Sequence, residues 1–89
     1  METEVTVYGL LRSATGDETV TLEWPGGTVT DAVAALVDAY PRAESYLYDG
    51  DELRASVRVS MDGERTALED RVPADASLTL MPAVQGGSR

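Results

Sequence analysis

One stretch of this chain has the spacing of an amphipathic helix, and it separates two regions that alternate like strands. Apolar side chains recur every three or four positions along it, at Val29, Val33, Leu36, Val37 and Tyr40. Pro25-Gly26-Gly27 precedes the stretch, and Pro41 ends it because a proline pushes the residue before it out of the helical region. A chain with one such helix has to bury its apolar stripe elsewhere, and we expect that stripe to pack against a sheet.

The start of this helix has two candidate caps. Thr30 is the favoured N-cap, with the carboxylate of Asp31 near the positive helix end, and Thr28 is the alternative. Residues 42–47 can add one further helical turn after Pro41.

The flanking regions contain short segments with strand periodicity. We predict strands at residues 4–8, 18–24, 56–61, 64–66 and 77–81. Residues 13–17 are predicted to turn between the first two, and Asp62-Gly63 is a strong two-residue hairpin signal. One helix on one mixed sheet of four to five strands is an α+β fold, and this order suits a β-grasp, in which the first and last strands lie parallel at the sheet centre.

Length and charge limit the partners. With 89 residues, we expect one domain over residues 1–82, a flexible tail over 83–89, and a monomer. The net charge of −9 argues against nucleic acids and anionic membranes. All seven cations are arginine, and strong acidity without lysine indicates a halophilic protein; steering of a basic partner is the alternative. No long apolar run or signal-peptide core is seen, so we expect a soluble, cytoplasmic protein.

The sequence lacks the residues that most enzymes use. It has no cysteine, histidine or lysine, which removes the thiolate, the imidazole base and the Schiff-base amine. A zinc site of the usual type is excluded, and Asp49-Gly50-Asp51-Glu52 lacks the spaced ligands of a calcium loop. We therefore expect no metal and no bound cofactor, and a substrate or carrier rather than an enzyme.

The chain closes on a thin, glycine-containing segment. Pro82 cannot donate to a strand ladder and so ends the last strand. Gly86-Gly87 has no Cβ atoms and can enter a narrow slot, and Ser88-Arg89 follow the pair.

Taken in order, these features resemble the ubiquitin-like sulfur carriers of the molybdopterin synthase small subunit type (MoaD/ThiS), including the small archaeal modifier proteins. The matching segments are Tyr8-Gly9-Leu10-Leu11-Arg12, Thr28-Val29 with Asp31, Tyr40-Pro41, Leu53-Arg54, Asp62-Gly63-Glu64 and the closing residues 80–87. The chain departs from the family in Ala83, which replaces a second proline, and in Ser88-Arg89, since the family ends on its glycine pair.

The resemblance implies a mechanism for the tail. After removal of Ser88-Arg89, an activating enzyme would use ATP to adenylate the carboxylate of Gly87, with Gly86 keeping the approach unhindered. The acyl group would then become a thiocarboxylate, as in molybdenum cofactor biosynthesis, or form an isopeptide bond to target-protein lysines. The implied partners are a ubiquitin-activating-type adenylating enzyme and the molybdopterin synthase large subunit.

The resemblance also implies a docking surface beside the tail. Its candidate residues are Tyr8, Leu10, Leu53, Leu80 and Val84, although strand alternation favours a core position for Leu80. The alternative function is a non-covalent β-grasp interaction module without acyl-transfer chemistry, for which Ser88-Arg89 is the main argument.

Overall fold

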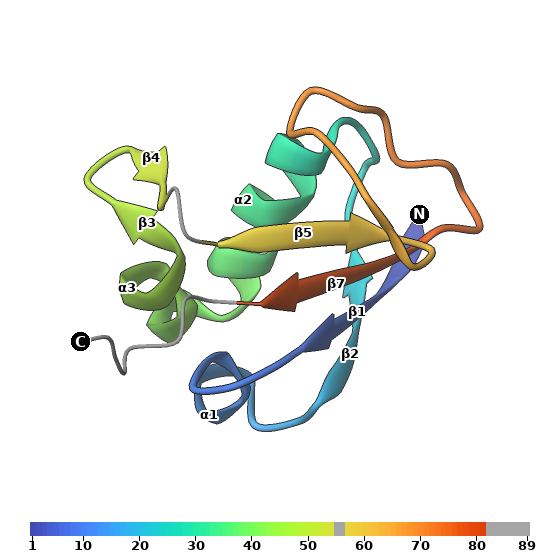
Figure 1. Cartoon of the computed structure of the whole chain (residues 1–89). Coiled ribbons are helices and arrows are strands. Elements are labelled where there is room, and N and C mark those ends of the chain that lie inside the picture. The colour runs from blue at the N-terminus through green and yellow to red at the C-terminus, as the bar shows by residue number, and fades with distance from the viewer. Residues whose placement is uncertain (55–56, 82–89) are drawn as a thin grey trace.

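Two parallel strands from opposite ends of the sequence form the middle of the sheet (Figure 1). The computed structural model describes residues 1–54 and 57–81. The sheet consists of β1 (Glu2–Val7), β2 (Thr19–Glu23), β5 (Arg58–Met61), β6 (Glu64–Arg65) and β7 (Ser77–Met81). Their order is β2-β1-β7-β5-β6, with β1 and β7 parallel and the other pairs antiparallel. The predicted mixed sheet and its parallel centre are confirmed.

The predicted helix is α2 (Val29–Ala39), and it lies across one face of this sheet (Figure 1). Its cap is Thr28 rather than Thr30, so the favoured assignment was wrong. Thr28 has extended backbone angles, its Oγ1 accepts from the Asp31 amide at 3.3 Å, and the Asp31 carboxylate accepts from the Thr28 amide at 3.0 Å. Thr30 is already inside the helix, where its Oγ1 donates to the carbonyl of Leu68 at 3.0 Å.

Short helices fill two connections. The predicted turn at residues 13–17 overlaps α1 (Leu11–Thr15), a short helix that places Leu11 fully in the core and ends at Gly16, whose φ is 87°. After Pro41, η1 (Pro41–Ala43) and α3 (Glu44–Leu47) carry Ala43 and Leu47 into the core, as the expected extra turn. A separate hairpin of β3 (Tyr48–Asp49) and β4 (Glu52–Leu53) follows. The Asp62-Gly63 hairpin is confirmed, with both residues at positive φ.

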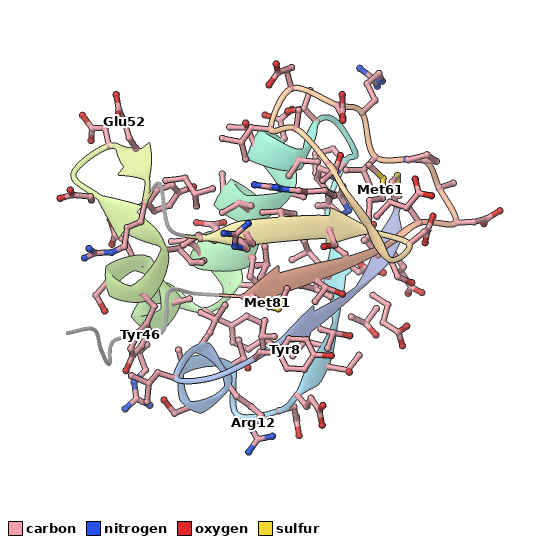
Figure 2. The ribbon with its side chains drawn as sticks, in the orientation of Figure 1. Tyr8, Arg12, Tyr46, Glu52, Met61 and Met81 are labelled. Carbon is pink, nitrogen blue, oxygen red and sulfur yellow. The ribbon has the colours of Figure 1, made fainter. Side chains whose placement is uncertain are left out.

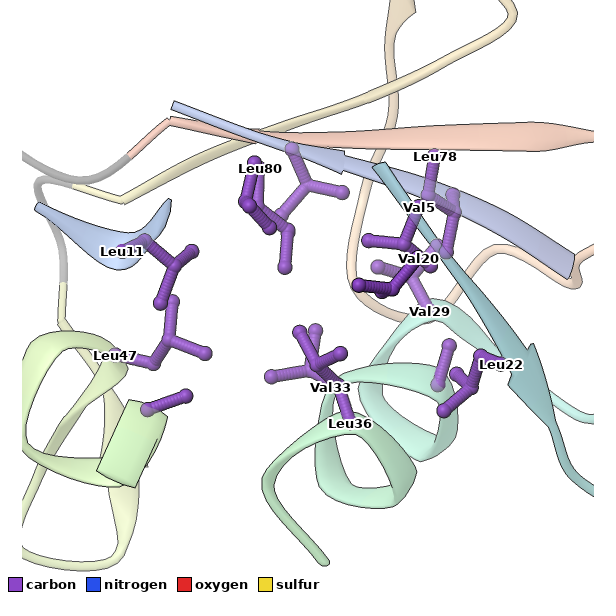
Figure 3. Packing of buried hydrophobic residues seen from close by; sticks show 14 of the residues in the cluster. Val5, Leu11, Val20, Leu22, Val29, Val33, Leu36, Leu47, Leu78 and Leu80 are labelled. Carbon is purple, nitrogen blue, oxygen red and sulfur yellow. The ribbon is translucent and has the colours of Figure 1, made fainter. Parts of the chain in front are cut away.

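The core lies between α2 and the inner face of the sheet (Figure 3). Strand alternation sends Val5, Leu78 and Leu80 inward, where they meet Val33 and Leu36 of the helix. Within the described residues, no helix has the length and apolar character required to cross a bilayer.

Candidate functional site at the end of β7

The parallel pairing of β1 and β7 determines where the chain leaves the sheet. Val7 is opposite Leu80, and the Tyr8 amide donates to the Leu80 carbonyl at 3.2 Å. Both strands therefore end at the same edge. Met81 is the last described residue, so the segment that carries Gly86 and Gly87 begins from this edge and lies outside the described residues. The proposed boundary between the domain and a tail at residue 82 stays a prediction.

Three large apolar side chains are exposed at this edge, and we call Tyr8, Leu10 and Met81 the exit patch. Their exposed fractions are 45%, 59% and 38%. Tyr8 and Met81 are next to each other because they extend the β1–β7 register by one residue, and Figure 2 shows both on the solvent side of the sheet. Leu10 follows two residues later, just before α1. Exposed apolar side chains grouped in this way are typical of a protein-binding surface.

The solvent face of the sheet beside the exit patch is polar but mostly uncharged at its centre. A row of hydroxyl side chains crosses four strands in register, comprising Ser60, Thr79, Thr6 and Thr19. Arg58 of β5 is opposite Met81 and is exposed. Glu2, Glu4 and Glu23 stand on the same face at the other end of β1 and β2, so in this chain of net charge −9 the hydroxyl row and Arg58 separate the exit patch from those carboxylates.

The structure separates the predicted docking residues. Tyr8 and Leu10 lie together in the exit patch. Leu80 is 1% exposed and faces the core, so it cannot contact a partner in this fold, as its alternation had suggested. Leu53 belongs to the separate β3–β4 hairpin and is partly buried against the core. Val84, like Gly86 and Gly87, lies outside the described residues.

Two residues at this edge, Met81 and Arg58, were not among the predicted site residues. Alternation along residues 77–81 could have identified Met81, because it sends Met81 to the face opposite Leu80. The position of Arg58 required the β5–β7 register, which pairs it with Met81 from a distant part of the chain.

Two titratable groups have shifted pKa values, and neither lies at this edge. Burial, and secondarily the charge of Glu44, raises the pKa of the Tyr48 phenol. Hydrogen bonds from the Ala67 amide and then the Thr66 hydroxyl lower the pKa of Asp70. In the described part of the chain, no group of three or more carboxylates is placed to hold a metal ion.

Comparison with known proteins identifies the relatives of this chain. The ThiS family pattern matches residues 5–87. Small archaeal modifier protein 1 of Haloferax volcanii is 37% identical over 83 residues, which cover 91% of this chain and 95% of that protein.

Solved structures of related proteins agree with these sequence matches. The crystal structure of SAMP1 from Haloferax volcanii superposes with a TM-score of 0.87 at 36% identity, covering 98% of this chain and 100% of that one. The CysO-type fold in the Amycolatopsis orientalis BexX/CysO complex gives a TM-score of 0.78 at 26% identity, with 96% and 99% covered. These relatives are small modifier and carrier proteins rather than enzymes, and their structures confirm the predicted β-grasp fold. The chain belongs to the ThiS family, with the ubiquitin-like sulfur carriers and small archaeal modifier proteins.

Proposed function

We propose that this protein is a ubiquitin-like modifier, a sulfur carrier, or both, and that its reactive end is the carboxylate of Gly87 after removal of Ser88-Arg89. The observation that carries the proposal is the position of β7. It ends at an exposed apolar patch on the edge from which the glycine pair follows. The relationship to small archaeal modifier protein 1 supports the same function.

The proposed chemistry begins with activation by a partner. A carboxylate oxygen of Gly87 attacks the α-phosphorus of ATP on the activating enzyme, and pyrophosphate leaves. Hydrosulfide then attacks the carbonyl carbon, AMP leaves and a proton is released, which gives the thiocarboxylate. In the modifier route, a thiol of the enzyme displaces AMP, and the amine of a target lysine then displaces that thiol to form an isopeptide bond. Apart from the Gly87 carboxylate itself, residues 1–89 contain no thiol, imidazole or amine side chain, so the nucleophiles that attack the activated carbonyl come from other molecules.

The exit patch is the proposed contact for the activating enzyme. The Amycolatopsis orientalis structure is a BexX/CysO complex, so a protein of this fold does associate with another protein. For this chain, an adenylating enzyme and the large subunit of molybdopterin synthase are the proposed partners, and the cytoplasm is the proposed compartment. ATP is proposed as a substrate of the enzyme rather than as a ligand of this protein.

Mass spectrometry tests the acyl chemistry directly. The full chain, a chain ending at Gly87, and the chain ending at Gly87 with Gly87→Ala are incubated with the cognate activating enzyme, ATP and sulfide. We expect a thiocarboxylate on the chain that ends at Gly87, a large loss of product with Gly87→Ala, and product from the full chain only when an extract of the source cells trims it. If the chain that ends at Gly87 forms neither adenylate nor thiocarboxylate, the carrier proposal fails.

Docking is tested separately by adding charge to the exit patch. Leu10→Asp and Met81→Asp should each weaken binding to the activating enzyme by about tenfold, because a carboxylate is costly to bury in an apolar contact. Ala74→Asp adds the same charge at an exposed position in the loop before β7 and serves as the matched control. Equal weakening by all three variants would contradict the assignment of the exit patch.

The modifier route makes one further prediction about products. Because the chain has no lysine, it offers no side-chain amine to a second copy of itself. Conjugates should therefore contain no chains of this protein linked through side-chain isopeptide bonds, and the Met1 amine is the one group that could receive a second copy. Tryptic mass spectrometry of purified conjugates measures this, and a branched peptide that joins two copies would contradict it.

The non-covalent alternative is favoured by one observation, the presence of Ser88-Arg89 after the glycine pair. It predicts that a native partner stays bound when Gly87 is replaced by alanine and that no cellular extract trims the chain. The mass of the mature protein from its own cells separates the two functions.

A further inference from the structure

Two adjoining hollows lie beside β5 and the β3–β4 hairpin. The first has a volume of about 240 Å³, and three arginines line it: Arg54, Arg58 and Arg65. The second has a volume of about 360 Å³, lies between α2 and the hairpin, and has Asp51 and Glu52 on its rim. Leu53 and Leu68 line both hollows, which therefore meet at these two leucines, and we call the two hollows together the groove.

The charge of the first hollow is unusual for this protein. Three of the seven cations in a chain of net charge −9 are gathered there. All three residues are exposed. In the described part of the chain, the one hydrogen bond found for their guanidinium groups runs from Arg54 Nη2 to the Ser45 carbonyl oxygen at 3.1 Å. That bond holds Arg54 beside α3 and leaves most of the fifteen guanidinium N–H donors of the three groups available to an anion.

The two leucines supply an apolar contact between the charged hollows. Leu68 is 37% exposed, which is high for an aliphatic side chain in a domain of this size. Leu53 packs its inner side on the core and turns its remaining surface to the hollows. At the other end, the Glu52 side chain points outward from β4 (Figure 2). The surface therefore runs from cationic through apolar to anionic.

We propose that this groove binds an extended peptide segment of a partner protein in which an apolar side chain stands between a carboxylate and a cation. The arginines would hold the carboxylate through charge-assisted hydrogen bonds, Leu53 and Leu68 would cover the apolar side chain, and Asp51 with Glu52 would face the cation. Charge complementarity selects this occupant. A free phosphate would need the arginines but not the leucines, and an all-basic or all-acidic segment would meet like charge at one end. The proposal does not depend on acyl chemistry at Gly87.

The probe is a synthetic peptide with two aspartates, one leucine, one glycine and two arginines, in that order. It is titrated into the full-length ¹⁵N-labelled chain at about 0.1 M salt, where the Debye length is about 10 Å and charge contacts are not yet fully screened. We expect the amide signals of Arg54, Arg65 and Leu68 to shift in a saturable way, because a groove of this size gives weak, transient binding. A peptide of the same composition with leucine at one end should bind about tenfold more weakly.

Matched charge reversals test the arginines. Arg54→Glu with Arg65→Glu should weaken binding of the probe by about tenfold or more. The same variant should gain affinity for a peptide that carries arginines on both sides of the leucine, which a merely misfolded chain would not do. Arg42→Glu, at an exposed position of η1 outside both hollows, should change the affinity by less than about twofold, since distant surface charges are screened.

Several outcomes would overturn the proposal. These are shifts confined to residues outside the groove, equal weakening by Arg42→Glu, and equal binding of the peptide with leucine at one end. If inorganic phosphate displaced the probe and shifted the same signals at equal concentration, the groove would be a site for small anions and not for a peptide. Shifts that grow with protein concentration in the absence of peptide would assign the groove to a second copy of this chain.

Discussion

At the scale of single residues, Gly27 occupies a backbone position that a side chain would strain. Its φ is 145°, and a Cβ atom there would collide with the Asp31 carboxylate that completes the helix cap. Gly27→Ala should therefore lower the free energy of unfolding by about 2–3 kcal/mol, measured by urea denaturation. Gly16→Ala is the control, because Gly16 has a φ of 87° but open space at its Cβ, and it should cost only about 1–2 kcal/mol. Equal losses would show that the collision with Asp31 is relieved at no cost.

Thr3 is a buried polar residue whose hydroxyl oxygen makes one specific hydrogen bond. It is buried on β1, and its Oγ1 accepts the indole Nε1–H of Trp24 at 2.9 Å. Thr3→Val keeps the shape but leaves that indole donor without a partner, so we expect a loss of about 1–3 kcal/mol in urea denaturation. Thr21→Val makes the same change at an exposed position on β2 and should stay within about 0.5 kcal/mol. If Thr3→Val left the free energy of unfolding unchanged, the Trp24 indole would have another hydrogen-bond acceptor in the variant.

At the scale of elements, two adjacent residues of β7 have different roles: Leu80 contributes to stability, and Met81 is proposed to contribute to binding. Leu80 is 1% exposed in the core and Met81 is 38% exposed in the exit patch. Leu80→Ala should cost about 2–5 kcal/mol, since it leaves a cavity under the central strand. Met81→Ala should cost within about 0.5 kcal/mol and weaken binding to the activating enzyme instead. Thermal unfolding measures the stability of both variants, and a titration with the activating enzyme measures their binding. If Met81→Ala lost stability and Leu80→Ala lost only binding, the side chains of β7 would face the opposite way from the structure.

At the scale of the whole molecule, the dominant property is its acidity. The net charge is −9 at pH 7 and the isoelectric point is near 4.2. Raising potassium chloride from about 0.1 M to about 1 M shortens the Debye length from about 10 Å to about 3 Å, which weakens the repulsion among exposed carboxylates. The unfolding midpoint at pH 7 should therefore rise with salt, and the rise should be smaller near pH 4.2. A midpoint that does not respond to salt at pH 7 would contradict the halophilic interpretation.

Local patterns in the sequence determined most of the secondary structure. The apolar spacing from Val29 to Tyr40 identified α2 because a helix exposes its period directly in the sequence, and alternation identified the main strands and the inward position of Leu78 and Leu80. Asp62-Gly63 gave its hairpin because the turn geometry depends on those two residues alone. The missing cysteine, histidine and lysine set the limits on chemistry without any structure.

Contacts between distant segments decided the rest. Thr28 caps α2 through its reciprocal hydrogen bonds with Asp31, while Thr30 lies inside the helix and donates to the carbonyl of Leu68, a contact over thirty-eight residues that the local sequence does not reveal. Residues 11–15 form a helix whose Leu11 is buried in the core. The sequence of this segment alone does not show that burial, because the side chains around Leu11 come from other elements. Arg58 lies beside Met81 only through strand register, and packing alone brings Arg54 and Arg65 into one hollow beside Leu53 and Leu68. Periodicity reports which way a side chain faces, whereas the tertiary fold decides what it faces.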